Sequence, residues 1–185
     1  MATETLLTAA PDAGLVEVVI EAEDWLQTLP DLPALADTAA HAALDAAGLE
    51  SEGFEIALLA CDDARITALN TSFRGREAPT NVLSWPAYDL PPPSTGALPT
   101  APTAPGALGD VAIALETCRR EALAAGRPLK DHVVHLILHG CLHLLGYDHE
   151  TEADAALMED VERRQLARMG IPDPYDHGEG HAPRD

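Results

Sequence analysis

The segment HGCLHLLGYDH, from His139 to His149, constrains the fold of this chain more than any other stretch. Its three histidines, His139, His143 and His149, stand at relative positions 0, 4 and 10, with Gly146 at position 7. On a helix, side chains four residues apart lie on one face. Gly146 can end such a helix in a left-handed conformation. We therefore expect the third histidine to turn back toward the first two, as a three-histidine zinc site requires.

A similar spacing occurs in the metzincin peptidase motif H-E-x-x-H-x-x-G-x-x-H. In this chain Gly140 stands where those peptidases have their general-base glutamate. Zinc lowers the pKa of bound water from about 15.7 to about 7, so the metal can supply hydroxide without that glutamate. The motif therefore predicts one Zn²⁺ per chain, bound by His139, His143 and His149, and it counts against peptidase chemistry.

Residues near the motif have more than one interpretation. Asp148 either accepts a hydrogen bond from an imidazole or caps the following helix. His135 is either a core residue or a partner of the metal site, because it lies four residues before His139. An anionic substrate would need a nearby cation, for which Arg74, and less strongly Arg76, is the candidate.

Composition limits the possible partners. The net charge of −20 over 185 residues argues against general affinity for nucleic acid, and no DNA partner is expected. Residues 65–130 are the exception, with seven Lys or Arg against five Asp or Glu. No apolar run is long enough to span a membrane and no secretory signal is visible, so a cytoplasmic protein without a membrane partner is expected.

Hydrophobic periodicity predicts an α/β (α+β) fold, in which a mixed sheet of four strands packs against about five helices. We expect one domain over residues 1–170, a mobile Pro-rich loop insertion at 87–107 and a disordered tail at 171–185. Strand order does not follow from the sequence. The predicted strands are 15–22, 54–60, 80–86 and 108–116, and the predicted helices are 33–49, 62–74, 116–126, 127–146 and 151–170.

The histidine motif resembles the signature of the YbeY family, the bacterial endoribonucleases and rRNA maturation factors. Two further blocks, LNTSFRGREAPTNVLSWP (69–86) and LGDVAIALETCRREA (108–122), resemble blocks of that family in the same order. Two positions depart from the pattern: Asn81 stands where the family often has aspartate, and Trp85 where it often has phenylalanine.

The resemblance implies a zinc ion on the three histidines, an important arginine at Arg74, and single-strand-specific RNA cleavage. The cleavage would serve maturation of the 16S rRNA 3′ end and ribosome quality control. Its partners would be rRNA and the small ribosomal subunit. From the negative charge we expect contacts with ribosomal proteins to deliver the RNA, and from their residue types we expect Trp85 or Tyr88 to stack on its bases. Two alternatives stay open: a non-catalytic zinc-containing ribosome-assembly factor and, less favoured, a zinc metallopeptidase.

Overall fold

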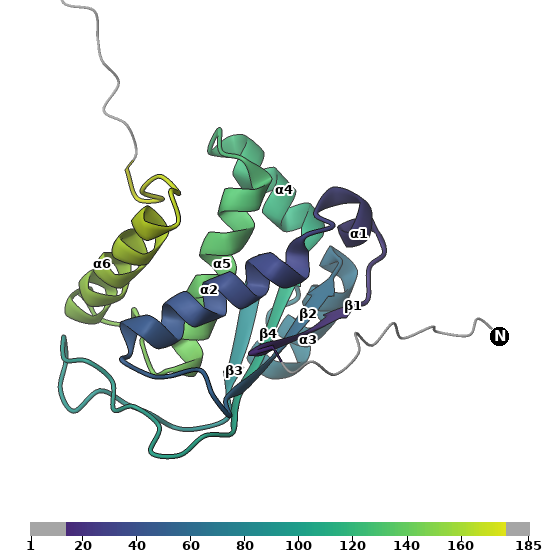
Figure 1. Cartoon of the computed structure of the whole chain (residues 1–185). Coiled ribbons are helices and arrows are strands. Elements are labelled where there is room, and N and C mark those ends of the chain that lie inside the picture. Colours follow the sequence, from purple (N-terminus) through teal and green to yellow (C-terminus); the bar gives the residue numbers. More distant parts are fainter. Residues whose placement is uncertain (1–13, 177–185) are drawn as a thin grey trace, which may run out of the picture.

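The computed structural model describes residues 14–176 and contains one mixed four-stranded sheet (Figure 1). Its spatial order is β1-β2-β4-β3, with β1–β2 and β2–β4 parallel and β3–β4 antiparallel. The predicted sheet is confirmed, and its strand order comes from tertiary pairing. The strands are β1 (Val16–Ile20), β2 (Glu55–Cys61), β3 (Val82–Pro86) and β4 (Ala107–Ala114).

The five predicted helices are present, and the structure adds a single-turn helix, α1, that hydrophobic periodicity could not reveal. Trp25 of α1 is fully buried, and its indole N–H donates to the Cys61 carbonyl oxygen at 2.9 Å. Among the described helices, none has the length and apolarity to cross a membrane. The helices are α1 (Asp24–Thr28), α2 (Leu32–Ala46), α3 (Asp63–Arg74), α4 (Leu115–Ala124), α5 (Leu129–Leu144) and α6 (Glu152–Arg168).

The sheet separates α3 from the other long helices. Successive residues of a strand point to opposite faces. On β4, Val111 and Ile113 belong to the main core formed with α2 and α5, whereas Ala112 and Ala114 belong to a smaller core with Ile66 of α3. Helix α5 contacts both β3 and β4, and α2 and α6 pack against it (Figure 1). The helix that carries the histidine motif is therefore the central helix of the larger layer.

The insertion was predicted at 87–107. Residues 87–106 have no regular secondary structure and join the antiparallel neighbours β3 and β4, whereas Ala107 is already the first residue of β4. The loop contacts the end of α5 where Leu90 meets Gly146, and it contacts α6 where the Gly96 N–H donates to Asp154 Oδ1 at 2.7 Å. An insertion at this place therefore lies beside the histidine motif.

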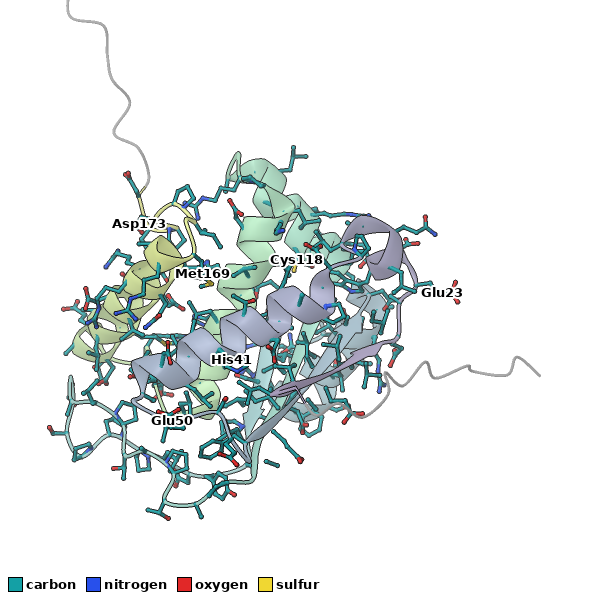
Figure 2. All side chains as sticks on the ribbon, in the orientation of Figure 1. Glu23, His41, Glu50, Cys118, Met169 and Asp173 are labelled. Carbon is teal, nitrogen blue, oxygen red and sulfur yellow. The ribbon has the colours of Figure 1, made fainter. Side chains whose placement is uncertain are left out.

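After α6 the chain turns back toward α5, where the Tyr175 ring packs against His135. Pro174 is buried, and Asp173 lies at the surface (Figure 2). The tail boundary that we predicted at residue 171 falls inside this packed segment. The remainder of the predicted tail, residues 177–185, lies outside the described residues.

Candidate metal centre

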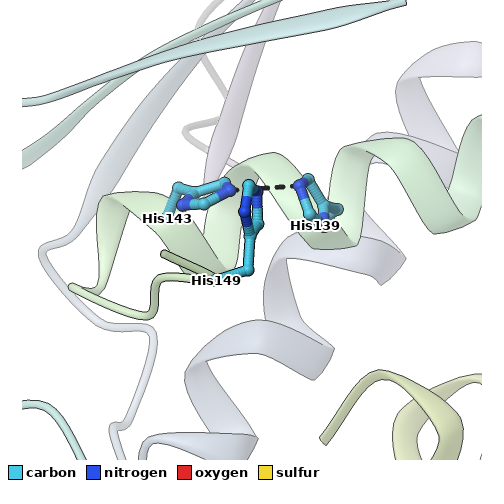
Figure 3. Close-up of side chains that lie close together, drawn as sticks. All are labelled: His139, His143 and His149. Carbon is cyan, nitrogen blue, oxygen red and sulfur yellow. Dashed lines mark hydrogen bonds between the residues drawn. The ribbon is translucent and has the colours of Figure 1, made fainter. Parts of the chain in front are cut away.

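The three motif histidines converge on one point (Figure 3). The ring centroids of His139 and His143 lie 4.6 Å apart, those of His143 and His149 4.9 Å, and those of His139 and His149 5.4 Å. One ring nitrogen of each residue lies within 4.8 Å of the other two. The structure therefore brings together all three predicted ligands: two from adjacent turns of α5 and one from the segment that follows.

A Schellman turn brings the third histidine back. The Tyr147 N–H donates to the Leu142 carbonyl oxygen and the Gly146 N–H to the His143 carbonyl oxygen, both at 3.1 Å. Gly146 has φ of +89°, as its place in the motif predicts. A Cβ at this position would also overlap the carbonyl oxygen of Leu90. Local turn geometry and contact with the loop together require glycine here.

Hydrogen bonds fix the tautomers of two histidines. His139 Nδ1 lies 2.7 Å from Glu162 Oε1, and His143 Nδ1 lies 2.9 Å from the carbonyl oxygen of Tyr147. A carboxylate and a carbonyl can only accept, so each neutral ring carries its proton on Nδ1. Both Nε2 lone pairs then face the same point.

The facing Nε2 atoms of His139 and His143 are 3.0 Å apart (dashed in Figure 3). Two lone pairs at that distance repel each other unless a cation lies between them. Tetrahedral zinc with Zn–N bonds of about 2.0–2.1 Å separates two ligand nitrogens by about 3.3 Å. The donor set therefore fits Zn²⁺ with His139, His143 and His149 as ligands.

The electrostatics of the site favour this arrangement. Burial, together with the neighbouring His139 and His149, lowers the pKa of His143 to about 4, so the ring stays neutral and can act as a ligand. Burial alone would raise the pKa of Glu162, but hydrogen bonds from His135 and His139 outweigh it and lower this pKa to about 2. A carboxylate behind a neutral ligand imidazole is the arrangement that orients histidines at metal sites.

Sequence reasoning missed Glu162, which is completely buried. The helical pattern of α6 could have revealed this residue, because Glu162 is a charged residue on the buried face of the helix, beside Met158, Val161 and Leu166. His135 belongs to the same group, since its Nε2 lies 3.5 Å from Glu162 Oε2. This distance favours the interpretation of His135 as a partner of the site.

Asp148 does not cap the following helix, and that interpretation is wrong. The N-cap of α6 is Thr151, whose hydroxyl accepts from the Asp154 N–H at 3.2 Å. Asp148 Oδ1 instead accepts from the backbone N–H of His149 at 2.7 Å. A role for Asp148 behind a ligand stays a prediction.

Gly140 faces the sheet, away from the converging nitrogens. A Cβ at this position would lie 2.9 Å from Val111 Cγ1 and 3.4 Å from Val82 Cγ2. A glutamate here has no room and points away from the site. Packing of α5 on the sheet therefore disfavours a glutamate at the position of the peptidase base.

Arg74 ends α3, on the other face of the sheet from α5, and is exposed, as is Arg76. Within residues 14–176, the guanidinium group of neither arginine forms a hydrogen bond or an ion pair; the backbone of Arg76 does, since its N–H donates to the Asn70 carbonyl oxygen and its carbonyl oxygen accepts from the Thr71 hydroxyl. The role of Arg74 therefore stays a prediction. Trp85 also faces the α3 side, where its ring meets Phe73 edge-on at 5.3 Å and lines an apolar groove of about 430 Å³. Tyr88 lies in the loop after β3 and is 42% exposed.

Asn81, one of the two departures from the family pattern, belongs to a group of hydrogen-bonded polar side chains. Its side-chain amide donates to Glu121 Oε2 at 2.9 Å, and the same oxygen lies 2.9 Å from His132 Nε2. An aspartate at this position would place a second carboxylate against Glu121. The neutral amide of Asn81 is therefore compatible with the carboxylate of Glu121 on α4, to which it donates.

Comparison with known proteins gives one consistent result. Residues 20–170 match a family model described as "Endoribonuclease YbeY". A protein of that name from Jannaschia sp. strain CCS1 is 52% identical over 160 residues, which cover 86% of this chain and 99% of the relative. Another, from Ruegeria pomeroyi, is 59% identical over 148 residues, or 78% of this chain and 90% of the relative. The solution structure of TM1509 from Thermotoga maritima aligns with a TM-score of 0.48 at 15% identity, over 91% of this chain and 99% of that one.

Proposed function

Because the chain belongs to the YbeY family of endoribonucleases, we propose that it is a zinc-dependent endoribonuclease that cleaves single-stranded RNA. We also propose that this cleavage serves maturation of the 16S rRNA 3′ end and ribosome quality control in the cytoplasm. The observation that carries the metal dependence is the pair of Nε2 lone pairs that face each other 3.0 Å apart. His139, His143 and His149 would hold the ion.

A bound Zn²⁺ would supply Lewis-acid stabilisation of phosphoryl charge and activation of water. Other residues of the chain hold the histidine rings in the orientation that metal binding requires. Glu162 and the Tyr147 carbonyl hold the rings of His139 and His143 with Nε2 directed at the ion position. Arg74 would bind a phosphate of the RNA, because a guanidinium pairs with phosphate oxygens through parallel N–H donors.

Metal analysis joined to an RNA cleavage assay tests the proposal. The purified chain should contain about one zinc per molecule and cleave a short single-stranded mimic of the 16S rRNA 3′ end, and a chelator should abolish that cleavage. His143→Ala should lose both zinc and cleavage. His41→Ala changes an exposed histidine on α2 and should retain both (Figure 2). Cleavage by the metal-free His143→Ala protein would refute the proposal.

The net charge of −20 favours a second candidate, a zinc-containing assembly factor that acts by binding basic ribosomal proteins. Complementation of a strain that lacks the protein separates the two. Arg74→Ala should fail to restore mature rRNA ends if chemistry is required, whereas Arg76→Ala, also exposed, should restore them. Full rescue by a folded, zinc-loaded Arg74→Ala protein would favour the binding role.

A further inference from the structure

Tyr175 lies beyond the segment that matches the family model, and its side chain returns to the metal centre. Its hydroxyl group hydrogen-bonds to Glu162 Oε2. Its ring packs edge-on against His135, with centroids 5.7 Å apart. A residue that follows α6 therefore contacts the carboxylate that orients His139.

Glu162 needs this contact. Its carboxylate is fully buried, and Oε1 accepts a hydrogen bond from the Nδ1–H of His139 at 2.7 Å. For Oε2, the nearest ring nitrogen is His135 Nε2 at 3.5 Å, the outer limit of a hydrogen bond. A buried carboxylate oxygen without a good donor is costly, and a phenol that faces a carboxylate must donate. Tyr175 is therefore the main donor to Oε2.

Other contacts hold the tyrosine in place independently of Glu162. The Arg163 guanidinium lies 4.9 Å above its ring, and Arg163 Nε is paired with Asp173 Oδ2 at 3.2 Å. The backbone N–H of Tyr175 donates to Asp173 Oδ1 at 2.8 Å, and Arg127 donates to the Pro174 carbonyl oxygen. The hydroxyl is thus positioned by its own segment before it meets the carboxylate.

We infer that Tyr175 is a positioning residue of the metal centre. By donating a hydrogen bond to Oε2, it holds the Glu162 carboxylate in the orientation in which Oε1 accepts from the Nδ1–H of His139. That bond keeps the His139 proton on Nδ1 and directs Nε2 toward the ion. The inference rests on the metal role proposed above for His139.

Removing one oxygen atom tests the inference. Tyr175→Phe keeps the ring and loses only the hydroxyl. We expect the zinc dissociation constant, measured by competition with a chromophoric chelator, to rise about tenfold, since partners behind metal ligands contribute about 10- to 100-fold. The visible spectrum of the Co²⁺-substituted protein should change as well. Tyr88→Phe removes the same atom from an exposed tyrosine and should bind zinc as the wild type does.

Two further measurements separate positioning from general stability. Tyr175→Phe should lower the unfolding midpoint in excess chelator, because the buried Oε2 of Glu162 loses its donor, and it should lower the midpoint by more in excess zinc, because zinc affinity falls as well. An equal fall in chelator and in zinc would assign Tyr175 a structural role only. In a Glu162→Gln background, Tyr175→Phe should change zinc affinity less than about twofold, because partners in one network are not additive. A further tenfold loss in that background would overturn the route through Glu162.

An unchanged zinc affinity in Tyr175→Phe would overturn the inference and leave the proposed function intact. A wild-type protein that binds zinc but does not cleave RNA would overturn the proposed function alone. A wild-type protein without stoichiometric zinc would overturn both.

Discussion

Val111 on β4 occupies the space that a side chain at Gly140 on α5 would need, with its Cγ1 atom 2.9 Å from the position of a Cβ. Gly140 directly follows His139, the first histidine of the candidate metal centre. The contact with Val111 fixes the rotation of α5 on the sheet, and so it decides that His139 and His143 face away from the strands.

Gly140→Ala should therefore destabilise the protein, although alanine is the better helix former. The helix gains about 1 kcal/mol from the substitution, whereas overpacking of a core costs about 1–3 kcal/mol. We expect a net loss of about 1 kcal/mol, or a fall of about 3 °C in Tm for a chain of this size. Thermal unfolding measures it.

Val111→Ala provides the control for that prediction. This substitution should destabilise the protein by itself, but in its presence Gly140→Ala should cost less, because the two methyl groups of Val111 that cause the crowding are gone. A Tm for Gly140→Ala equal to or above that of the wild type would contradict the packing argument.

Gly146→Ala should be more harmful, and it should affect metal binding too. The position has φ of +89° and its Cβ would overlap the Leu90 carbonyl oxygen. We expect a loss of about 3 kcal/mol or more in unfolding free energy and weaker zinc binding, because this turn presents His149.

Gly126 offers a matched comparison in urea unfolding. It has φ of +62° and nothing within 4 Å of its would-be Cβ. Gly126→Ala should cost only the backbone strain, about 1 kcal/mol. Equal costs at the two glycines would show that contact with the loop is unimportant.

Asp63 should make the stability depend on acidic pH. Its Oδ1 accepts from the N–H and the hydroxyl of Thr117, at 3.0 and 2.7 Å, and so caps α4 from another helix; its Oδ2 pairs with Arg120 at 2.8 Å. Burial alone would raise the pKa of Asp63, but the hydrogen bonds from Thr117 and Arg120 lower it below its ordinary value.

A lowered folded-state pKa adds stability above the unfolded-state pKa, and that stability is lost as pH falls through the folded value. At neutral pH the wild type should be more stable than Asp63→Asn by up to about 1 kcal/mol, because asparagine keeps an acceptor for Thr117 but loses the charge that pairs with the partly exposed Arg120. The difference should shrink as pH falls below about 4, the ordinary value of an aspartate. Urea unfolding over a pH series measures it, with Asp89→Asn in the exposed loop as control. A difference that grows toward acid would reverse the assigned sign.

Binding of naked single-stranded RNA should be weak and should fall steeply with salt. The chain carries a net charge of −20, so contacts to phosphates must come from a few arginines and lysines. Fluorescence anisotropy at about 50 and 200 mM salt measures this. Equal affinity at both salt concentrations would show that charge does not govern access, and that delivery of the RNA on a ribosomal particle is not needed.

The sequence by itself determined the helices and strands and the meeting of the three histidines of the candidate metal centre. Periodicity located the four strands and five of the six helices, and the spacing of His139, His143, Gly146 and His149 contained the turn that brings three rings together. These features are local: a helix repeats every 3.6 residues, and a glycine ends it within one turn.

Only the tertiary structure decided the surroundings of those rings. Glu162 and Tyr175 come from segments 23 and 36 residues after His139, and nothing in their own local patterns shows which side chain they will meet. The order β1-β2-β4-β3, the burial of Trp25 that forms α1, and the contact of Leu90 with Gly146 are likewise long-range. Such contacts depend on which faces are buried against one another, and that is fixed when the whole core packs.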